Sequence, residues 1–365
     1  MLTYLFPSIL ALVFTFLFTF LIRRLALRYQ IVDRPLLARK IHQKNIPLLG
    51  GVGLFLGFGL TLFYFTFFTD QILGGYMLAK HIIGLLLAGL ILIFGGILDD
   101  KYQLSPVKQF IWPLLASAII ISSGIGIDYI SNPFGEALRL DTIKFQIFSI
   151  NNIPYYVVLF ADVFTLVWLL GMTYTTKFLD GLDGLVSGIT VIACIVLFFL
   201  SLRPEVMQPE TALVCVILAG AASGFLIWNF YPAKIFLGGG GSTFTGFALG
   251  TLAIISGGKI ATALLILGIP IFDVAWVIAR RIWQKKSPFK TADRKHLHFR
   301  LLDIGFSHRM AVLFLYSISL TFGTSALFLQ GKEKVLALCV LVLLMVILAL
   351  SLVWVCKYRK FSTQS

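Results

Sequence analysis

Residues 175–188 read TTKFLDGLDGLVSG and join two strongly apolar runs, residues 157–172 and 185–200. A lysine and two aspartates therefore lie at the junction of segments that have the composition of membrane-spanning helices. Such a helix needs about 20 predominantly apolar residues to cross a bilayer. Ionisable groups at this depth are costly without partners, so the junction predicts a functional site at the membrane surface.

The composition of the whole chain indicates an all-α polytopic membrane protein. Of its 365 residues, 59% are hydrophobic and 13% are charged, whereas a soluble domain carries about a quarter charged residues. We expect one transmembrane domain over residues 1–365, in contact with the lipid bilayer and without a nucleic-acid partner. Eleven segments predict transmembrane helices, at residues 3–22, 49–69, 80–98, 108–127, 156–173, 184–201, 211–230, 243–256, 259–279, 309–330 and 334–356.

Basic residues predict how these helices are oriented. Eleven spans divide the loops into two alternating sets, and one set holds 23 of the 30 lysines and arginines while the 16 acidic residues divide equally. The positive-inside rule assigns the basic set to the cytoplasm. We therefore expect an outer N-terminus, a cytoplasmic C-terminus and cytoplasmic catalytic loops in a multi-pass protein of the cell (inner or plasma) membrane. The charge of this face alone favours topology and contact with anionic lipids over a site for an anionic substrate.

Two pairs of aspartates fall at the same predicted depth. Asp99 and Asp100 end the third span, and Asp180 and Asp183 open the sixth with a spacing that places both on one helical face. Helix capping explains Asp180 or Asp183 but does not explain a matching pair on another helix. The four carboxylates therefore predict one cytoplasmic cluster that handles a cation or a phosphate.

A glycine-rich stretch precedes the eighth span, where residues 229–246 read NFYPAKIFLGGGGSTFTG. A flexible linker fits poorly between such apolar neighbours, and the Gly-Lys-Ser/Thr of a P-loop is missing. A glycine-rich turn that enters a helix can still present backbone N–H groups to a phosphate.

The connection after the ninth span is basic, with nine lysines and arginines from Arg280 to Arg309. His296 and His298 are two residues apart, which places both rings on one side of a strand or extended loop. No further close ligands favour zinc, whereas Arg and His side chains suit a pyrophosphate. A solvated run of charges is the alternative interpretation.

Taken in order, these stretches resemble the polyprenyl-phosphate N-acetylhexosamine-1-phosphate transferases of glycosyltransferase family 4, from about residue 30 to about residue 310. DRPLLARKIHQKNIPLLGG is similar to the family's opening cytoplasmic loop, LDDKYQLSPVK to its Asp-Asp motif and FLDGLDGLVSG to its Asp-Gly-x-Asp-Gly-Leu motif. NFYPAKIFLG resembles the approach to its glycine loop, and PIFD with ADRKHLHFRLLDIGFSH looks like its last cytoplasmic loop.

The resemblance implies an enzyme that joins a polyprenyl phosphate to the phosphoryl sugar of a UDP-sugar and releases UMP, in cell-envelope glycan or peptidoglycan precursor synthesis. The loop ADRKHLHFRLL, residues 292–302, which we call the histidine loop, looks more like the branch that uses UDP-N-acetylglucosamine. The phospho-N-acetylmuramoyl-pentapeptide branch usually carries three consecutive histidines there. The resemblance implies catalytic roles for Asp99, Asp100, Asp180 and Asp183, a Mg²⁺ ion on Asp99, Asp100 and Asp183, and substrate binding by Lys40, His42, Lys108, Lys177, Asn229, Gly238, Gly239, Gly241, Ser242, Arg294, His296, His298 and Arg300.

Three features depart from the family pattern. Tyr174 and Lys177 occupy the places of two asparagines, Gly239 that of an aspartate, and Phe299 that of a histidine. The second asparagine and the aspartate are usual magnesium contacts in relatives, so the need for Mg²⁺ is open. The Lys177 ammonium either occupies part of the metal position as a compact point charge, or only pairs with Asp180 while magnesium binds to the other carboxylates.

Three functions therefore stay open at the level of sequence. They are an active transferase, a catalytically weakened family member that binds lipid phosphate or regulates a partner, and a transporter. A transporter is expected to carry charges near the middle of its spans. In this chain, Asp162 is the main charged residue inside a predicted span. A homodimer is also left open.

Overall fold

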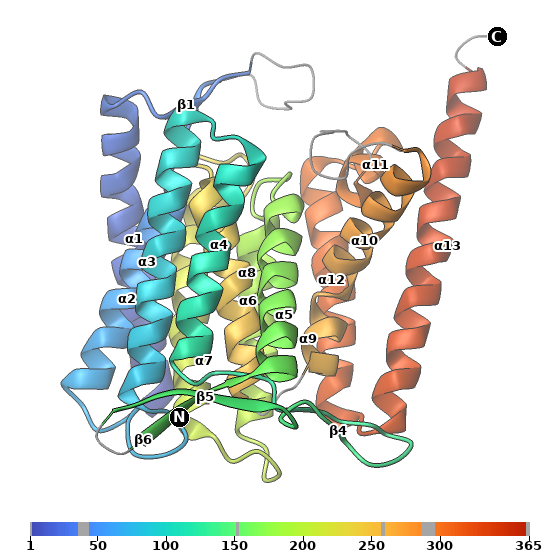
Figure 1. Cartoon of the computed structure of the whole chain (residues 1–365). Coiled ribbons are helices and arrows are strands. Elements are labelled where there is room, and N and C mark those ends of the chain that lie inside the picture. Colours follow the sequence, from blue (N-terminus) through green and yellow to red (C-terminus); the bar gives the residue numbers. More distant parts are fainter. Residues whose placement is uncertain (1, 36–43, 151–152, 257–259, 286–295, 363–365) are drawn as a thin grey trace.

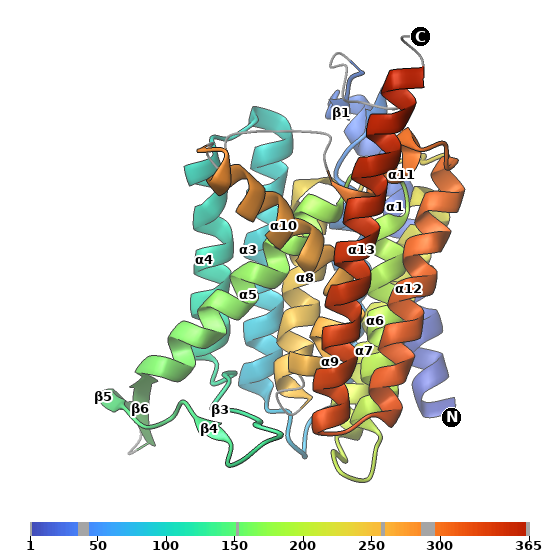
Figure 2. The same ribbon diagram turned by 90° about the vertical axis from the view of Figure 1, so that its right-hand side faces the viewer.

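The computed structural model describes residues 2–35, 44–150, 153–256, 260–285 and 296–362, which fold into one bundle of helices (Figure 1; Figure 2). The prediction of an all-α bundle is confirmed. Its helices, in chain order, are α1 (Leu2–Arg28), α2 (Gly50–Phe67), α3 (Ala79–Tyr102), α4 (Pro106–Ser122), α5 (Leu159–Leu179), α6 (Leu185–Ser201), α7 (Pro209–Asn229), α8 (Gly238–Ile255), α9 (Ile260–Ile266), α10 (Gly268–Trp283), α11 (Leu297–Asp303), α12 (His308–Phe328) and α13 (Lys332–Ser362).

Short antiparallel hairpins flank the bundle, and the sequence did not predict them. They are β1 (Val32–Asp33) with β2 (Ile46–Pro47), β3 (Tyr129–Ile130) with β4 (Leu138–Arg139), and β5 (Lys144–Ile150) with β6 (Ile153–Val158). The predicted span at 156–173 begins too early, because α5 starts only at Leu159. The residues of β6 read IPYYVV, and aromatic and β-branched residues favour a strand over a helix. Asp162 consequently lies in the first turn of α5, where its Oδ2 accepts a hydrogen bond from the Val158 N–H at 2.9 Å.

The start of α1 and the end of α13 lie at opposite ends of the bundle (Figure 1). α3 and α5 finish at the end that Figure 1 draws uppermost, where β1 and α11 also lie, whereas β4, β5 and β6 lie at the other end. We call the first of these the upper end. The residues that directly follow α3 and α5 therefore meet at one surface of the bundle.

Fewer helices than the eleven predicted have the length and composition of a membrane span. Among the described residues, seven qualify, or eight if the bent pair α9 and α10 is one span. α4 and α6 are apolar but have only 17 residues each. α8 is buried almost throughout and packs against α2, α3, α5 and α6. Because other helices cover it, α8 does not need the strongly apolar surface of a helix that faces lipid. The chain is a multi-pass membrane protein.

The ninth predicted span, residues 259–279, is not one straight helix. α9 and α10 are bent by 82° relative to each other, and Pro270 lies beside the break. Proline lacks the N–H that would continue the helix and clashes with the preceding turn, so sharp bends commonly occur at proline. After the bend, α10 packs against α5 and α13 and presents Asp273 to α11.

Glycines let the backbone of α8 approach its neighbours closely. A Cβ atom at Gly51 of α2 would collide with Gly241, and one at Gly96 of α3 would collide with Gly240. Small residues at such contacts are a principal means by which membrane helices pack. The contact with Gly96 places the first turn of α8 beside the last turns of α3, and this arrangement builds the site described below.

We expect Gly96→Leu to destabilise the protein, because its side chain would force α3 and α8 apart. Overpacking typically costs about 1–3 kcal/mol, which a thermal unfolding curve of the detergent-purified protein detects as a lower midpoint. Gly171→Leu in α5 is the matched control, since no described atom lies within 4 Å of a Cβ at Gly171. Equal unfolding midpoints for the two variants would contradict the close contact.

Candidate active site

The acidic cluster consists of Asp99, Asp100, Asp180 and Asp183 at the upper end of the bundle. Asp99 and Asp100 lie in the last turn of α3, Asp180 directly follows α5, and Asp183 lies in the turn that leads to α6. Asp100 interacts electrostatically with Asp99 and Asp180, and Asp180 also interacts with Asp183. The structure therefore brings together the two pairs that the sequence carries on separate helices.

Hydrogen bonds from α7 hold the turn between α5 and α6. Gly184 has a φ of 82°, which glycine adopts without strain. The Gly184 N–H and the Ser187 hydroxyl both donate to Asn229 Oδ1, at 3.0 and 3.1 Å, and Asn229 Nδ2 donates to Ile235 O at 3.1 Å. Asn229 thus positions the turn and the loop before α8. Its direct contact with a substrate stays a prediction.

Asp183 is oriented from two further directions. The Ala233 N–H donates to Asp183 Oδ2 at 2.9 Å, and the Asp183 N–H donates to His308 Nε2 at 2.8 Å. The His308 ring also stacks on Tyr231, with 4.4 Å between ring centroids. The loop before α8 therefore holds this carboxylate, and the start of α12 holds the backbone of the same residue.

The predicted phosphate-binding turn at residues 238–242 is the first turn of α8. The Gly239 N–H donates to Asp100 Oδ1 at 3.0 Å, and a carboxylate at a helix N-terminus is electrostatically favourable. A Cβ at Gly238 would collide with Asp100 Oδ2. Gly238 and Gly239 therefore adjoin the acidic cluster, but the Gly239 N–H already has a carboxylate partner.

The structure gives packing roles to the other two predicted residues of this turn. Gly241 packs against the backbone of Gly51, so it faces α2. The Ser242 hydroxyl donates to Gly238 O at 3.0 Å and is 2% exposed. Neither residue is brought to the acidic cluster, because the glycine stretch is helical and its side facing α2 is closed.

Lys177 reaches the acidic cluster from the last turn of α5. Its Nζ lies 3.4 Å from Asp99 Oδ2 and 2.8 Å from Gln109 Oε1. Gln109 Nε2 in turn donates to Asp99 Oδ1 at 2.8 Å, so the glutamine contacts both charged groups. The alternative in which Lys177 pairs only with Asp180 is therefore wrong, since the ammonium contacts a carboxylate of the other pair.

Two stacked histidines lie beside the acidic cluster. His296 immediately precedes α11 and His298 lies in its first turn, so the predicted strand or extended loop is partly helical. The two rings are nonetheless parallel, with 5.6 Å between centroids and 6° between planes. Asp273 of α10 anchors them, because its Oδ2 lies 2.8 Å from His296 Nδ1 and its Oδ1 accepts from the Leu297 N–H at 2.8 Å.

His298 is a buried imidazole with unused hydrogen-bonding capacity. It is 1% exposed, and neither ring nitrogen has a hydrogen-bond partner among the described residues. The ring lies against Gly181, where a Cβ would collide with its Nε2. Burial lowers the pKa of His298 to about 3, so the ring is neutral near pH 7. Buried polar groups without partners are unusual, so this ring is a candidate ligand contact.

Asp180 is an exposed residue, but neighbouring protein atoms crowd its carboxyl group. The loss of bulk water around the carboxyl raises the pKa of Asp180 to about 7, and the nearby Asp100 and Asp183 act in the same direction. A carboxyl with a pKa near neutrality can both accept and release a proton under physiological conditions.

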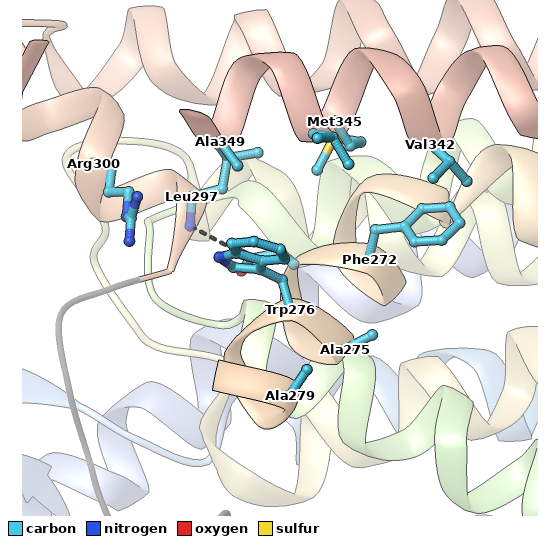
Figure 3. Close-up of a pocket in the computed structure, with 11 residues that line it drawn as sticks. Phe272, Ala275, Trp276, Ala279, Leu297, Arg300, Val342, Met345 and Ala349 are labelled. Carbon is cyan, nitrogen blue, oxygen red and sulfur yellow. Dashed lines mark hydrogen bonds between the residues drawn. The ribbon is translucent and has the colours of Figure 1, made fainter. Parts of the chain in front are cut away.

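An apolar pocket of about 290 Å³ adjoins the histidines, between α10, α11 and α13 (Figure 3). Figure 3 shows Arg300 at one end of the pocket and Phe272 toward the other. Asp273 and Arg300 are its charged residues. The remaining wall is apolar and consists of Phe272, Ala275, Trp276, Ala279, Leu297, Val342, Met345, Val346 and Ala349.

The remaining predicted residues are placed only in part. Lys40, His42 and Arg294 lie outside the described residues. Lys108 is exposed in the first turn of α4, one residue before Gln109. Their substrate contacts, like that of Arg300, stay predictions.

Three residues that build the site were not predicted from the sequence. Asp273 had an available indication, because an acid within an apolar segment is often functional. His308 ends the motif ADRKHLHFRLLDIGFSH, but its contact with Asp183 depends on the fold. Nothing in the sequence around Gln109 distinguishes it from an ordinary polar residue at a helix start.

Carboxylates, a lysine and histidines gathered at the ends of membrane helices are typical of an integral membrane enzyme. Residues 82–257 match the profile of glycosyl transferase family 4. The chain is 32% identical to the probable undecaprenyl-phosphate N-acetylglucosaminyl 1-phosphate transferase of Bacillus subtilis, over 93% of this chain and 88% of that protein. We conclude that the chain belongs to glycosyl transferase family 4.

Two further relatives have similar coverage. The chain is 30% identical to the undecaprenyl-phosphate alpha-N-acetylglucosaminyl 1-phosphate transferase of Thermotoga maritima, over 85% of this chain and 86% of that protein. It is 29% identical to the decaprenyl-phosphate N-acetylglucosaminephosphotransferase of Mycolicibacterium smegmatis, over 84% of this chain and 77% of that protein. The family resemblance read from the motifs is therefore confirmed.

Phosphotransferases of this family typically use Mg²⁺, but the acidic cluster as arranged does not fit an ion held by Asp99, Asp100 and Asp183. Among the described residues, no group of three or more His, Cys, Asp and Glu side chains is placed to bind one metal ion. Each of the three carboxylates already accepts a hydrogen bond from an ammonium or a backbone N–H. The Lys177 ammonium also repels a second cation.

We expect Asp273→Ala to loosen α11, because the variant leaves the Leu297 N–H and His296 Nδ1 without their buried acceptor. Such a loss costs about 1–3 kcal/mol, so amide hydrogen exchange over residues 297–303 should accelerate by about tenfold or more. Asp303→Ala, which removes an exposed carboxylate from the same helix, should leave this exchange unchanged. Unaltered exchange in Asp273→Ala would contradict the anchoring role.

Proposed function

We propose that the protein transfers N-acetylglucosamine-1-phosphate from UDP-N-acetylglucosamine to a membrane polyprenyl phosphate and releases UMP, in cell-envelope glycan or peptidoglycan precursor synthesis. The observation that carries this proposal is the acidic cluster with Lys177 at the ends of membrane helices, beside the unpartnered His298 ring. One substrate of this reaction is a lipid and the other is a soluble nucleotide, so the chemistry must occur at a bilayer surface. The names of the similar proteins support this choice of donor and acceptor.

In the proposed reaction, an oxygen of the lipid phosphate attacks the phosphorus that carries the sugar. A P–O bond forms there, the bond from the same phosphorus to the bridging oxygen breaks, and UMP leaves with that oxygen. Both reactants are anions, so catalysis depends on positioning and on cations that neutralise their charge. Lys177 supplies such a cation. Asp180, with its pKa of about 7, takes up the proton of the lipid phosphate, whose second pKa is about 6.

The histidine loop suits the donor. A neutral imidazole can donate one hydrogen bond to a phosphate oxygen, and an Arg guanidinium can make a bidentate contact. We assign the pyrophosphate and uridine side of the site to Arg294, His296, His298 and Arg300. We assign further substrate contacts to Lys40, His42, Lys108, Asn229, Gly238 and Gly239.

The apolar pocket suits part of the acceptor. Its wall is hydrophobic, and Arg300 lies at one end (Figure 3). Asp273 joins the pocket to the site, because it lines the pocket and also anchors His296. A prenyl segment in this pocket would direct its phosphate toward the histidines and the acidic cluster, while the rest of the chain stays in the bilayer.

We also propose that the upper end is cytoplasmic and that the chain crosses the membrane eleven times. The excess of lysine and arginine in the loops of that side supports the orientation. α4 and α6 pack along longer apolar helices, and α8 is surrounded by them. A short or less apolar helix can still cross the membrane when longer apolar helices pack around it.

We expect Asp180→Asn to lower the rate of UMP release by about 100-fold, because the amide cannot accept the proton. The assay uses purified protein with UDP-N-acetylglucosamine and undecaprenyl phosphate, and an elution profile confirms folding. Asp141→Asn, which changes a carboxylate paired with Lys144 outside the cluster, is the control and should retain activity.

Donor specificity is tested in the same assay. UMP release that depends on UDP-N-acetylmuramoyl-pentapeptide instead would assign the protein to the other branch of the family. Binding of undecaprenyl phosphate without release of UMP from either donor would favour the catalytically weakened alternative. Either result would overturn the proposed reaction.

We expect Ala349→Phe to raise the KM for undecaprenyl phosphate several-fold and to leave the KM for UDP-N-acetylglucosamine unchanged, because the ring fills the apolar pocket. Leu343→Phe in the same helix is the matched control, since Leu343 is 60% exposed and outside the pocket lining. An effect of Ala349→Phe on the nucleotide alone would mean that the pocket does not hold the lipid.

A further inference from the structure

The Lys177 side chain is held in place by neighbouring side chains. A lysine side chain is flexible and would ordinarily place its ammonium in water. Here the side chain is 23% exposed, and Nζ lies between Asp99 Oδ2 at 3.4 Å and Gln109 Oε1 at 2.8 Å. Gln109 is itself fixed, because its Nε2 donates to Asp99 Oδ1 and to Leu104 O, both at 2.8 Å. The ammonium therefore has a defined position at the edge of the acidic cluster.

A second contact aligns the two helices that form this arrangement. Tyr174, one turn before Lys177 in α5, stacks on Phe110, the residue after Gln109 in α4. Their ring centroids are 6.0 Å apart and their planes differ by 17°. Two adjacent residues of α4 thus contact two residues one turn apart in α5. The stack keeps Gln109 within reach of Lys177, so the position of the ammonium depends on two coupled contacts.

At Gly239 the acidic cluster adjoins a residue that has no side chain. A Cβ at Gly239 would lie 3.2 Å from Asp99 Oδ2 and 3.3 Å from Asp100 Oδ1, so any acidic side chain there would enter the cluster. A third carboxylate in contact with these two would require more positive charge than one ammonium provides. Lys177 and Gly239 are therefore complementary features of one site.

We infer that the Lys177 ammonium is the built-in cation of the acidic cluster, replacing charge that a bound metal ion would supply, and that Gln109 is its positioning residue. The inference rests on the proposed function for its catalytic meaning, since the ammonium would neutralise the donor pyrophosphate and the lipid phosphate. A resident ammonium stays in place between turnovers. It carries one positive charge, so the arginines assigned to the donor, Arg294 and Arg300, would supply the remaining neutralisation.

Metal binding tests this inference without any turnover. Mn²⁺, a spectroscopic substitute for Mg²⁺, is titrated into the detergent-purified protein without nucleotide, and the signal of free Mn²⁺ is followed by electron paramagnetic resonance. We expect weak binding to the wild type. The double variant Lys177→Asn with Gly239→Asp should bind Mn²⁺ at least about tenfold more tightly, because it removes the cation and adds a carboxylate ligand. Tight binding to the wild type at Asp99 and Asp100, abolished in Asp99→Asn, would overturn the inference.

Activity in EDTA provides the second arm. We expect the wild type to retain UMP release in EDTA, and Lys177→Asn to lose about 100-fold under the same conditions. The double variant should recover activity only when Mg²⁺ is added. Lys101→Asn is the matched control, because Lys101 is exposed near the cluster with its ammonium over the Tyr102 ring. Complete loss of wild-type activity in EDTA, restored by Mg²⁺, would overturn the inference.

Gln109→Met tests the positioning role separately. The variant keeps the length of the side chain but removes both hydrogen-bonding groups. We expect kcat in EDTA to fall about tenfold with little change in the KM for UDP-N-acetylglucosamine, and the Mn²⁺ affinity to stay weak because Lys177 is retained. An unchanged kcat would remove Gln109 from this role. If no donor gives UMP in any condition, the proposed function fails, while the Mn²⁺ titration still decides whether Lys177 replaces metal-ion charge.

Discussion

Carboxylates at the ends of membrane helices repel one another and have lost part of their hydration. The rest of the structure depends on how neighbouring groups offset this unfavourable electrostatic free energy. Three of the four carboxylates are stabilised, each by a different element. Asp99 contacts Lys177 of α5, Asp100 accepts the Gly239 N–H at the start of α8, and Asp183 accepts the Ala233 N–H. The elements that stabilise the charges are therefore also those that orient the site.

The central position of α8 makes this arrangement geometrically possible. Its glycines meet Gly51 and Gly96 at backbone distance, so its first turn reaches the end of α3 and can present an N–H to Asp100. Such an approach leaves no room for side chains along the contact. Packing and chemistry are consequently linked in residues 238–242, where the glycines shape the bundle and also complete the acidic cluster.

Two structural expectations were wrong, because tertiary contacts overrode the preference of the local sequence. Glycine is a poor helix former, so residues 238–242 indicated a turn, yet packing against α2 and α3 stabilises a helix there. The apolar run at 259–279 indicated one span, but the chain bends by 82° between α9 and α10. The bend directs Asp273 to the histidine loop. Hydropathy alone does not report the direction of a helix after a break.

The sequence by itself determined the membrane class, the family, the depth of the four aspartates and the presence of a histidine loop, because apolar length, charge position and motif order are properties of the linear chain. Only the tertiary structure decided which groups meet. Gln109 joins Lys177 to Asp99, and Asp273 anchors His296. These contacts link residues far apart in the chain, and no local pattern encodes them. They exist because helices from different parts of the sequence end at the same surface of the bundle.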